Sequence, residues 1–325
     1  MRKLASCTNL PADCWRQPRH ACEERTECTI PGGMALANNY GNGILEDSRG
    51  CLAGQEKSVE NIRSEVRRIW NTNASYWDSR MNEGNAFHRV LLLPALERLL
   101  ELKKGQRVLE VACGNGQLSR WMAGKGTSVV ALDISDKLIE IAKSKGCPPG
   151  GSIEYITADA SDENTFNQFV TARFDSVVCN MALMDMPEIE PLAKALPLVL
   201  KRGGAFVFSA THPCFNMSDM RRVASETEEG GVVTETCGIE IRHYLSQRTE
   251  RGLAIAGQPE AQLYFERPLS LLLRPFLHNG LLINAFEEPS FPHPDKMEKT
   301  QPVKWFDWQN YPDIPPVIVV RLISS

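Results

Sequence analysis

Short apolar runs alternate with helix-like segments through the middle of the chain, and this alternation restricts the possible folds more than any other feature. The five apolar runs lack polar alternation, as strands buried on both faces require, and they span residues 106–114, 128–135, 153–160, 174–183 and 204–213. Helix-like segments follow the first four runs, at 116–126, 136–146, 163–170 and 188–204. Strands that alternate with helices form βαβ crossovers, so the sequence predicts a mostly parallel sheet with helices on both faces.

Two further regions complete the predicted fold. Before the alternation, residues 58–80 and 87–102 have apolar side chains at helical spacing. After it, residues 269–280 have a helical pattern, and residues 281–291 and 315–324 have the pattern of strands. We therefore predict an α/β fold with a Rossmann-like, doubly wound sheet of seven strands, mostly parallel with an antiparallel last strand. The last two strands are expected to run antiparallel to each other.

The ends of this pattern suggest the domain organisation. Residues 1–56 show neither helical nor strand periodicity and are expected to be a poorly ordered N-terminal extension, whereas residues 57–325 are expected to form one domain. Within that domain, residues 214–268 are polar and too long for an ordinary connection, so we expect an insert that covers the substrate. Five of the ten cysteines fall in the first 51 residues without a C-x-x-C pair, which favours free thiols and no metal site. His20 lies close to Cys22, which leaves a metal site open as the alternative.

Charge and hydropathy argue against several classes of partner. The net charge is −4 and no long basic run is present, so nucleic acid is not an expected partner. No apolar run approaches the roughly 20 residues of a membrane span, and the start lacks the apolar stretch of a signal peptide. We expect a cytoplasmic protein without a membrane partner, and the sequence leaves the oligomeric state open.

The first apolar run ends in a glycine turn, "VLEVACGNG" (108–116). Gly114 and Gly116 let the backbone approach a ligand without an intervening side chain, and the following helix points its free amides at the same place. In doubly wound folds this edge of the sheet binds ligands, and dinucleotides and S-adenosylmethionine (SAM) are the two classes that fit. The third glycine of a dinucleotide fingerprint would fall at Ser119, where it is absent.

Carboxylates at the strand ends favour SAM. Asp133 ends the second apolar run, where it can accept both hydroxyls of a ribose, and Asp159 ends the third, near the expected position of the adenine. Glu110 lies in the first run, four residues before Gly114. An acidic pocket suits the sulfonium and ammonium groups of SAM, whereas a pyrophosphate prefers amide dipoles and cations.

Four segments resemble, in order and spacing, the successive motifs of class I SAM-dependent methyltransferases: "VLEVACGNGQLS", "VVALDIS", "ITADA" and "FDSVVCNMALMDM". The chain is most similar to the small-molecule group that includes the ubiquinone/menaquinone-type enzymes. The resemblance extends over about residues 58–325 and includes the lead-in "NASYWDSRM", like the helix that covers the cofactor in that family. The chain departs from the family at Ala112-Cys113-Gly114, where Asp-x-Gly is usual, and at Glu266-Arg267, where His-Arg is frequent.

The resemblance implies a set of cofactor-binding residues. They are Tyr76, Trp77, Glu110, Ala112, Cys113, Gly114, Gly116, Asp133, Ile134, Asp159, Ala160, Asn180 and Met181. In this set Glu110 would order the glycine turn and hold the methionine ammonium, Asp133 would hold the ribose, and Asp159 would meet the adenine edge. Tyr76 and Trp77 would cover the cofactor from the N-terminal helix.

The predicted reaction is in-line transfer of the sulfonium methyl group to a small, partly apolar molecule. His212 is the first candidate for a general base, because it follows the fifth apolar run at its carboxyl end and its pKa range suits neutral pH. His88 and Asp185 are further candidates. Oxygen, nitrogen and carbon acceptors are not separated by the sequence.

Two other functions remain open at this stage. One is a SAM-binding protein that acts as a scaffold or regulator without transferring the methyl group, because a fold does not fix a function. The other is a nicotinamide-dependent dehydrogenase. The missing third glycine and the acidic side chain of Asp159 speak against the dehydrogenase.

Overall fold

The computed structural model describes residues 48–293 and 307–324, and side chains from Val59 onward except that of Glu235. Most of the predicted extension, residues 1–47, lies outside the described residues. Its remaining part belongs to the first helix, α1 (Ser48–Met81), which therefore begins before the expected domain boundary at residue 57.

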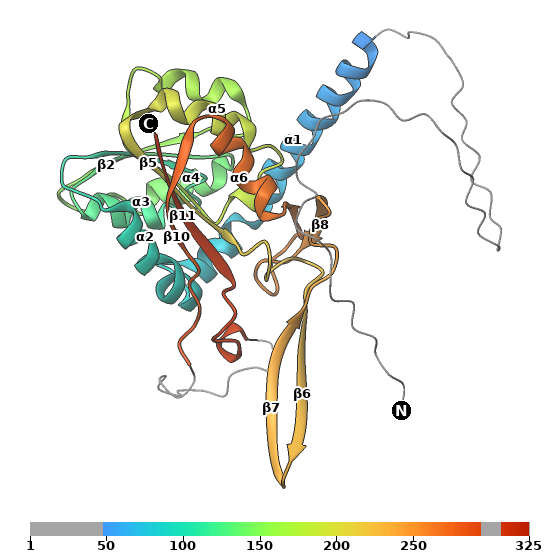
Figure 1. Cartoon of the computed structure of the whole chain (residues 1–325). Helices are drawn as coiled ribbons and strands as arrows, with labels where there is room; N and C mark the ends of the chain where they lie inside the picture. Colours follow the sequence, from blue (N-terminus) through green and yellow to red (C-terminus); the bar gives the residue numbers. More distant parts are fainter. Residues whose placement is uncertain (1–47, 294–306, 325) are drawn as a thin grey trace, which may run out of the picture. The chain divides into compact units, whose positions relative to one another are not determined.

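A seven-stranded sheet in the order β10-β11-β5-β4-β1-β2-β3 organises the described chain (Figure 1). Its strands are β1 (Arg107–Val111), β2 (Ser128–Asp133), β3 (Ser152–Thr157), β4 (Phe174–Asn180), β5 (Leu200–Thr211), β10 (Leu281–Glu287) and β11 (Val317–Ser324). The strands β1 to β5 pair in parallel, whereas β11 pairs antiparallel with both β5 and β10. The predicted fold class and the antiparallel final pair are confirmed.

Helices cover both faces of this sheet. They are α2 (Leu93–Leu100), α3 (Gln117–Gly124), α4 (Asp136–Ser144), α5 (Glu190–Val199) and α6 (Leu269–His278), with short helical turns η1 (His88–Leu92), η2 (Glu163–Phe169), η3 (Leu183–Asp185) and η5 (Trp308–Asn310). Successive strand residues point to opposite faces. Leu109 thus packs in a buried cluster with Leu196 of α5 and Phe276 of α6, whereas its neighbour Val108 packs with Met122 of α3 in a second buried cluster.

The loops between strands and helices are set by local backbone chemistry. Ser135 caps α4, because its hydroxyl oxygen accepts a hydrogen bond of 3.1 Å from the Leu138 amide. Gly126, which follows α3, has a φ of 85°, a left-handed conformation that glycine adopts without steric cost. These caps separate the strands from the helices as the sequence predicts.

The insert at residues 214–268 contains four strands that the sequence analysis did not assign. They form two antiparallel ribbons, β6 (Arg221–Glu229) with β7 (Val232–Glu240) and β8 (Arg248–Gly252) with β9 (Gln262–Glu266). Figure 1 shows β6 and β7 extending away from the seven-stranded sheet. Both faces of this ribbon are largely exposed, so its sequence lacks the apolar alternation that reveals a half-buried strand.

The ribbon β8–β9 is attached to the long helix. Leu263 and Phe265 of β9 form a small buried cluster with Val66 and Ile69 of α1. The insert and α1 therefore meet over the carboxyl ends of the sheet strands.

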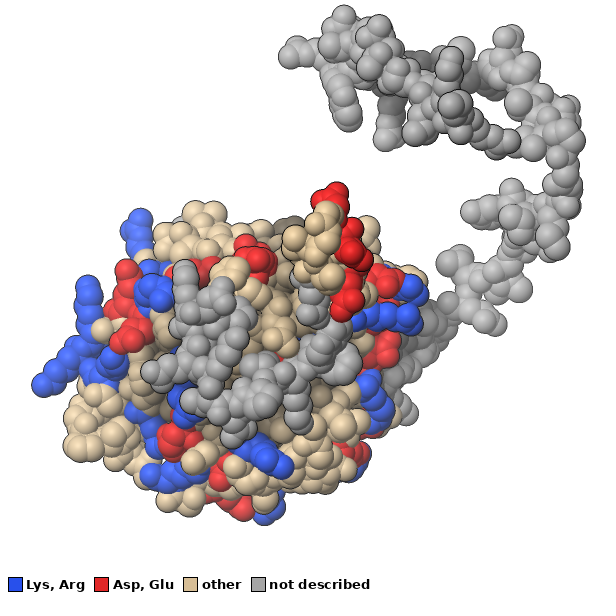
Figure 2. All heavy atoms as spheres, turned by 90° about the horizontal axis from the view of Figure 1, so that it is seen from below, with Lys and Arg blue, Asp and Glu red and all other residues tan. Residues whose placement is uncertain are grey.

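The distribution of surface charge and the apolar character of the helices bear on the possible partners. Figure 2 shows basic and acidic side chains interspersed over the face seen from below. Within residues 48–293 and 307–324, none of the helices has both the length and the apolar character needed to cross a membrane.

Candidate active site

A left-handed turn joins β1 to α3. Three of its residues have positive φ angles, namely Ala112 (56°), Gly114 (55°) and Gly116 (72°). Left-handed backbone costs a residue with a β-carbon roughly 1–2 kcal/mol, so Ala112 is held there by its surroundings. Met181, directly after β4, has the same kind of backbone with a φ of 53°. Strain of this kind gathers at functional sites, and here it lies at the ends of two neighbouring strands.

The two glycines of the turn have different physical roles. A β-carbon at Gly114 would meet no atom within 4 Å, so the space beside it is open. A β-carbon at Gly116 would lie 2.3 Å from the hydroxyl oxygen of Tyr155. Gly116 is therefore needed for packing against β3, and it does not line the cavity that Gly114 borders.

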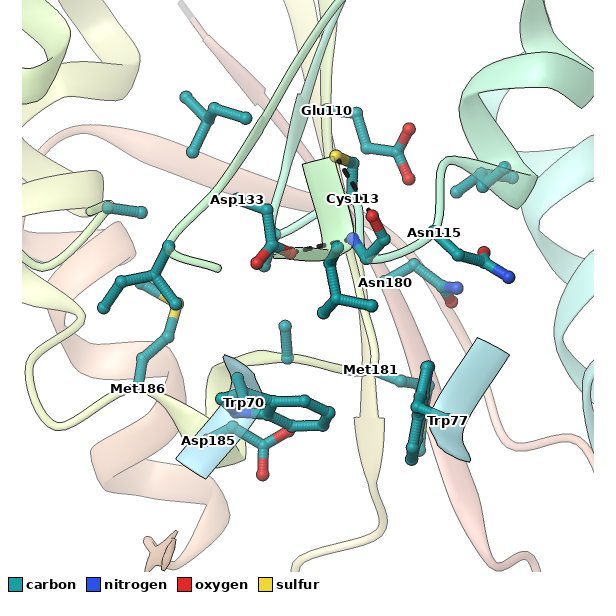
Figure 3. A pocket seen from close by; sticks show the side chains of 18 of the residues that line it. Trp70, Trp77, Glu110, Cys113, Asn115, Asp133, Asn180, Met181, Asp185 and Met186 are labelled. Atoms are coloured by element: carbon teal, nitrogen blue, oxygen red, sulfur yellow. Dashed lines mark hydrogen bonds between the residues drawn. The ribbon is translucent and has the colours of Figure 1, made fainter. Parts of the chain in front are cut away.

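A cavity opens where the turn faces the ends of β1 to β4 and helix α1 (Figure 3). Of the residues predicted to bind a cofactor, those that line it are Trp77, Glu110, Ala112, Cys113, Gly114, Asp133, Ile134, Asp159, Ala160, Asn180 and Met181. Gly116 and Tyr76 do not line it. The hydroxyl of Tyr76 instead donates a hydrogen bond to the carbonyl of Ala256, which joins α1 to the insert.

One face of α1 forms the opposite wall. Val66, Trp70, Trp77 and Met81 all line the cavity, at intervals that place them on one side of the helix. The rings of Trp70 and Trp77 meet edge to face, with centroids 5.2 Å apart. Figure 3 shows both indoles across the cavity from Asp133. The sequence analysis missed Trp70 as a site residue, although its spacing of seven from Trp77 was visible.

Polar contacts fix α1 to the glycine turn. The side-chain amide of Asn115 donates to Asp78 Oδ1 at 2.8 Å and to the carbonyl of Asn82 at 3.1 Å. Lys145, beyond α4, also pairs with Asp78. The helix that covers the cavity is thus joined to both the turn and the following βα unit.

Three carboxyl groups give the cavity its electrostatic character. Burial raises the pKa of Glu110 to about 8, against a hydrogen bond from the Ser119 hydroxyl that lowers it. Burial also raises the pKa of Asp133 to about 6, although the amides of Ser135 and Gly114 donate to it. The pKa of Asp159 is raised for the same reason, opposed by the Ser161 amide and by Arg63 at 3.9 Å.

These carboxyl groups suit a cationic ligand. Among the side chains the structure describes, neither Glu110 nor Asp133 forms an ion pair, so neither has a protein cation to balance a buried charge. A ligand with a sulfonium and an ammonium group would supply that balance. The open space at Gly114 also leaves room for a ligand against the backbone. On both grounds the residues present fit SAM.

A second cavity adjoins the first and extends under the insert. The residues common to both are Trp77, Met81, His88, Leu92, Met181 and Asp185. The second cavity continues along the end of β5 and over β8 and β9, where Met217, Tyr264 and Phe265 provide apolar wall. This arrangement places a larger, partly apolar space directly beside the proposed cofactor site.

Asp185 and His88 are the titratable groups where the cavities meet. Asp185 is buried, which raises its pKa to about 8, and its Oδ1 accepts a 2.8 Å hydrogen bond from Gln262. Burial lowers the pKa of His88 to about 4, so its ring is neutral at physiological pH. Its Nδ1 lies 3.0 Å from the Gln117 side-chain amide, and its buried Nε2 has no partner among the described residues.

His212 has a different environment. Its Nδ1 accepts a 3.1 Å hydrogen bond from the Cys214 amide, and its Nε2 lies 2.8 Å from Glu288 Oε1. Its ring packs on Phe215 and borders neither cavity. Burial lowers the pKa of His212, whereas Glu288 raises it. The geometry therefore favours Asp185 and His88 over His212 for contact with a substrate.

Metal chemistry has no visible site in the described ranges. No group of three or more histidine, cysteine, aspartate or glutamate side chains is placed there to hold a metal ion. The cysteine-rich stretch near the N-terminus lies outside those ranges.

The strand order, the left-handed turn and the acidic cavity together define a class of protein. Residues 109–208 match the family model described as a methyltransferase domain. This match confirms the resemblance to class I SAM-dependent methyltransferases that the sequence shows.

Named relatives agree with this class. The chain is 30% identical over 138 residues to a ubiquinone biosynthesis O-methyltransferase from Bordetella avium, a match that covers 42% of this chain and 56% of the relative. It is 31% identical over 157 residues to a protein of the same name from Hahella chejuensis, covering 46% of this chain and 63% of the relative. The matches thus span less than two thirds of these relatives.

A solved structure shares the fold. It is a SAM-dependent methyltransferase from Mesorhizobium loti, with a TM-score of 0.52 and 23% identity. The similarity covers 71% of this chain and 96% of that one. At this level of identity the likeness supports the fold.

Proposed function

We propose that this chain is a SAM-dependent methyltransferase that acts on a small, partly apolar molecule. The observation that carries the proposal is the pair of adjoining cavities. One is lined by Glu110, Asp133 and Asp159 beside the glycine turn, and the other is larger and partly apolar. No feature of residues 48–293 and 307–324 favours a scaffold without catalytic activity.

The first cavity would hold the cofactor. Bound SAM supplies a methyl group on a sulfonium, which is activated for in-line displacement. Asp133 would accept the ribose hydroxyls, Asp159 would bind the adenine edge, and Glu110 would balance the ammonium group. Trp70 and Trp77 would exclude water from the methyl group. The protein thus contributes orientation and electrostatics.

The second cavity would hold the acceptor, with its nucleophilic atom near Asp185 and His88. Burial raises the pKa of Asp185 to about 8, which makes its ionised form a stronger base than an ordinary carboxylate, so Asp185 is the base we propose. Because only the ionised form accepts a proton, we expect activity to rise as the pH approaches 8. His88 Nε2 would hydrogen-bond the same part of the acceptor. The names of the relatives favour oxygen as the methylated atom.

Three expectations from the sequence belong to the same proposal. The sequence predicts a dispensable extension of residues 1–56, and because α1 begins at Ser48 we propose that the functional domain is complete without residues 1–47. We also propose that its acceptor is not a nucleic acid. A chain that starts at Ser48 should then bind S-adenosylhomocysteine as the full chain does. The cytoplasmic location stays a prediction.

The test is a search for the acceptor. The full chain is incubated with SAM labelled in the methyl group and with a metabolite extract, and labelled products are separated by mass. We expect one or a few small, partly apolar products that disappear in an Asp133→Ala variant. Labelled macromolecules only, or no product although the protein binds S-adenosylhomocysteine, would contradict the proposal.

A further inference from the structure

Arg222 of β6 lines the second cavity, and aromatic rings flank its guanidinium group. Its Cζ lies 4.5 Å from the centroid of the Trp308 ring and 5.8 Å from that of Tyr311. Stacking on an aromatic face leaves the edge of the guanidinium plane to make hydrogen bonds. Arg222 is therefore held in an orientation that suits recognition of a planar group.

Within the described part of the chain, no protein acceptor meets this edge of the Arg222 guanidinium. Across the residues that the structure describes, the side chain of Arg222 forms no hydrogen bond and no ion pair, and its Nε is buried without a partner. The nearby Tyr311 is also buried, and its hydroxyl likewise has no partner. Two buried polar groups thus lack partners next to one cavity. Buried polar groups normally have partners, so this pair points to a ligand.

The other arginines of the cavity provide a comparison. Arg251 forms an ion pair with Glu65. Arg267 donates hydrogen bonds to four backbone carbonyls, those of Leu183, Phe265, Met186 and Pro187. Both arginine side chains therefore already have partners within the protein. Arg222 is the arginine of this cavity whose hydrogen-bonding capacity is unused within the described chain.

A carboxylate is the ligand group that fits best. Its two oxygens match two N–H groups on one edge of a guanidinium, and the opposite charge balances a cation that is partly removed from water. Among the described residues, Asp307 is the carboxylate that acts electrostatically on Arg222, and it accepts a hydrogen bond from the Gln309 amide. Asp307 forms no hydrogen bond or ion pair with Arg222 among the contacts of the described residues, so the guanidinium edge stays without an acceptor there.

We propose that Arg222 binds a carboxylate of the methyl acceptor, so that the acceptor is a partly apolar organic acid whose methylated atom lies at the Asp185 end of the same cavity.

 This inference rests on the proposed function, because it names the class of molecule that the same site would methylate. The apolar wall of the cavity would hold the hydrocarbon part of that acid.

The test compares an acid with its neutral counterpart. The full chain, saturated with S-adenosylhomocysteine, is titrated with 2-naphthoate and with 2-naphthamide in a calorimeter. We expect 2-naphthoate to bind about 10-fold or more tightly, the scale of one hydrogen-bonded charge. Arg222→Met should abolish this preference. The control Arg251→Met, which removes an arginine of the same cavity that is paired with Glu65, should keep it.

Three results would overturn the inference. They are equal binding of acid and amide by the unaltered chain, no binding of 2-naphthoate at millimolar concentration, and a preference that survives in Arg222→Met. Binding of S-adenosylhomocysteine is measured separately for each variant by thermal shift. A chain that never binds S-adenosylhomocysteine contradicts the proposed function, whereas normal binding of it with no acid preference contradicts only the role of Arg222.

Discussion

The amide of Gly114 donates a 2.8 Å hydrogen bond to Oδ2 of Asp133, which joins the glycine turn to the end of the neighbouring strand. Oδ1 of the same carboxylate accepts a 2.9 Å hydrogen bond from the Ser135 amide, at the start of α4. One buried side chain thus holds two adjacent βα turns in place. The ligand-binding edge of the sheet is organised before a ligand arrives, which lowers the entropic cost of binding.

Asp133→Ala should weaken binding of S-adenosylhomocysteine by on the order of 1.5–3 kcal/mol, the range for hydrogen bonds to a charged group. The physical reason is the loss both of a ribose acceptor and of the contact that orders the turn. Calorimetric titration measures the change. Glu154→Ala, an exposed carboxylate on β3, is the matched control and should leave the affinity unaltered. Equal affinities in the two variants would place the cofactor elsewhere.

The two glycines of the turn should respond differently to alanine. Gly114→Ala imposes left-handed strain of roughly 1–2 kcal/mol without a collision, so its main effect should fall on cofactor affinity. Gly116→Ala adds a β-carbon 2.3 Å from the Tyr155 hydroxyl, so it should lower the melting temperature further. The extra loss should shrink in a Tyr155→Phe background, because that hydroxyl has no partner to lose. Identical melting temperatures for the two glycine variants would refute this distinction.

Much of the fold could be predicted because its strands are buried on both faces. Continuous apolar runs such as that of β4 mark such strands, and glycines mark the helix ends. The ribbons of the insert could not be found in this way, because β6 and β7 are exposed and polar on both faces. Their pairing depends on contacts between distant segments, which a local pattern does not contain.

The candidate site was predictable to a similar degree. The positions of Glu110, Asp133 and Asp159 follow from strand ends, and the structure brings all three to one cavity, whereas their roles stay predictions. The orientation of His212 could not be read from the sequence, because Glu288 comes from the loop after a distant strand. The orientation of the Arg222 guanidinium could not be predicted for the same reason, because Trp308, on which it stacks, lies far along the chain.

Stability should fall as the pH rises from about 6.5 to 8 in the absence of cofactor. Glu110 and Asp185 have folded-state pKa values of about 8, raised from 4.5 and 3.8, so each keeps a proton in the folded chain that the unfolded chain has lost. Each such proton lowers the free energy of unfolding by about 1.4 kcal/mol per pH unit. His88, with a pKa lowered from 6.5 to about 4, is still partly protonated in the unfolded chain near pH 6.5, so it opposes this fall at the lower end of the range and is neutral in both states by pH 8.

Urea unfolding at several pH values between about 6.5 and 8 measures the slope of the free energy of unfolding against pH. Glu110→Gln, which can keep the hydrogen bond to Ser119, should remove about half of it, and Asp185→Asn about the other half. A slope of zero in the unaltered chain, or one that neither variant reduces, would show that these carboxyl groups are ionised in the folded protein.

Once an acceptor is known, Asp185→Asn should reduce turnover by about 100-fold or more, the usual scale of general-base catalysis. His212→Asn should change turnover much less, because the His212 ring borders neither cavity. Initial rates at saturating SAM measure both. A large loss in His212→Asn with normal turnover in Asp185→Asn would restore His212 as the base.

The central claim is that the cavity beside the glycine turn binds SAM, and calorimetric titration of the full chain with S-adenosylhomocysteine and with NAD tests it most directly. We expect one site per chain for S-adenosylhomocysteine, with affinity weakened in Asp133→Ala and unaltered in Glu154→Ala, and no saturable binding of NAD. Tight binding of NAD without binding of S-adenosylhomocysteine would contradict it.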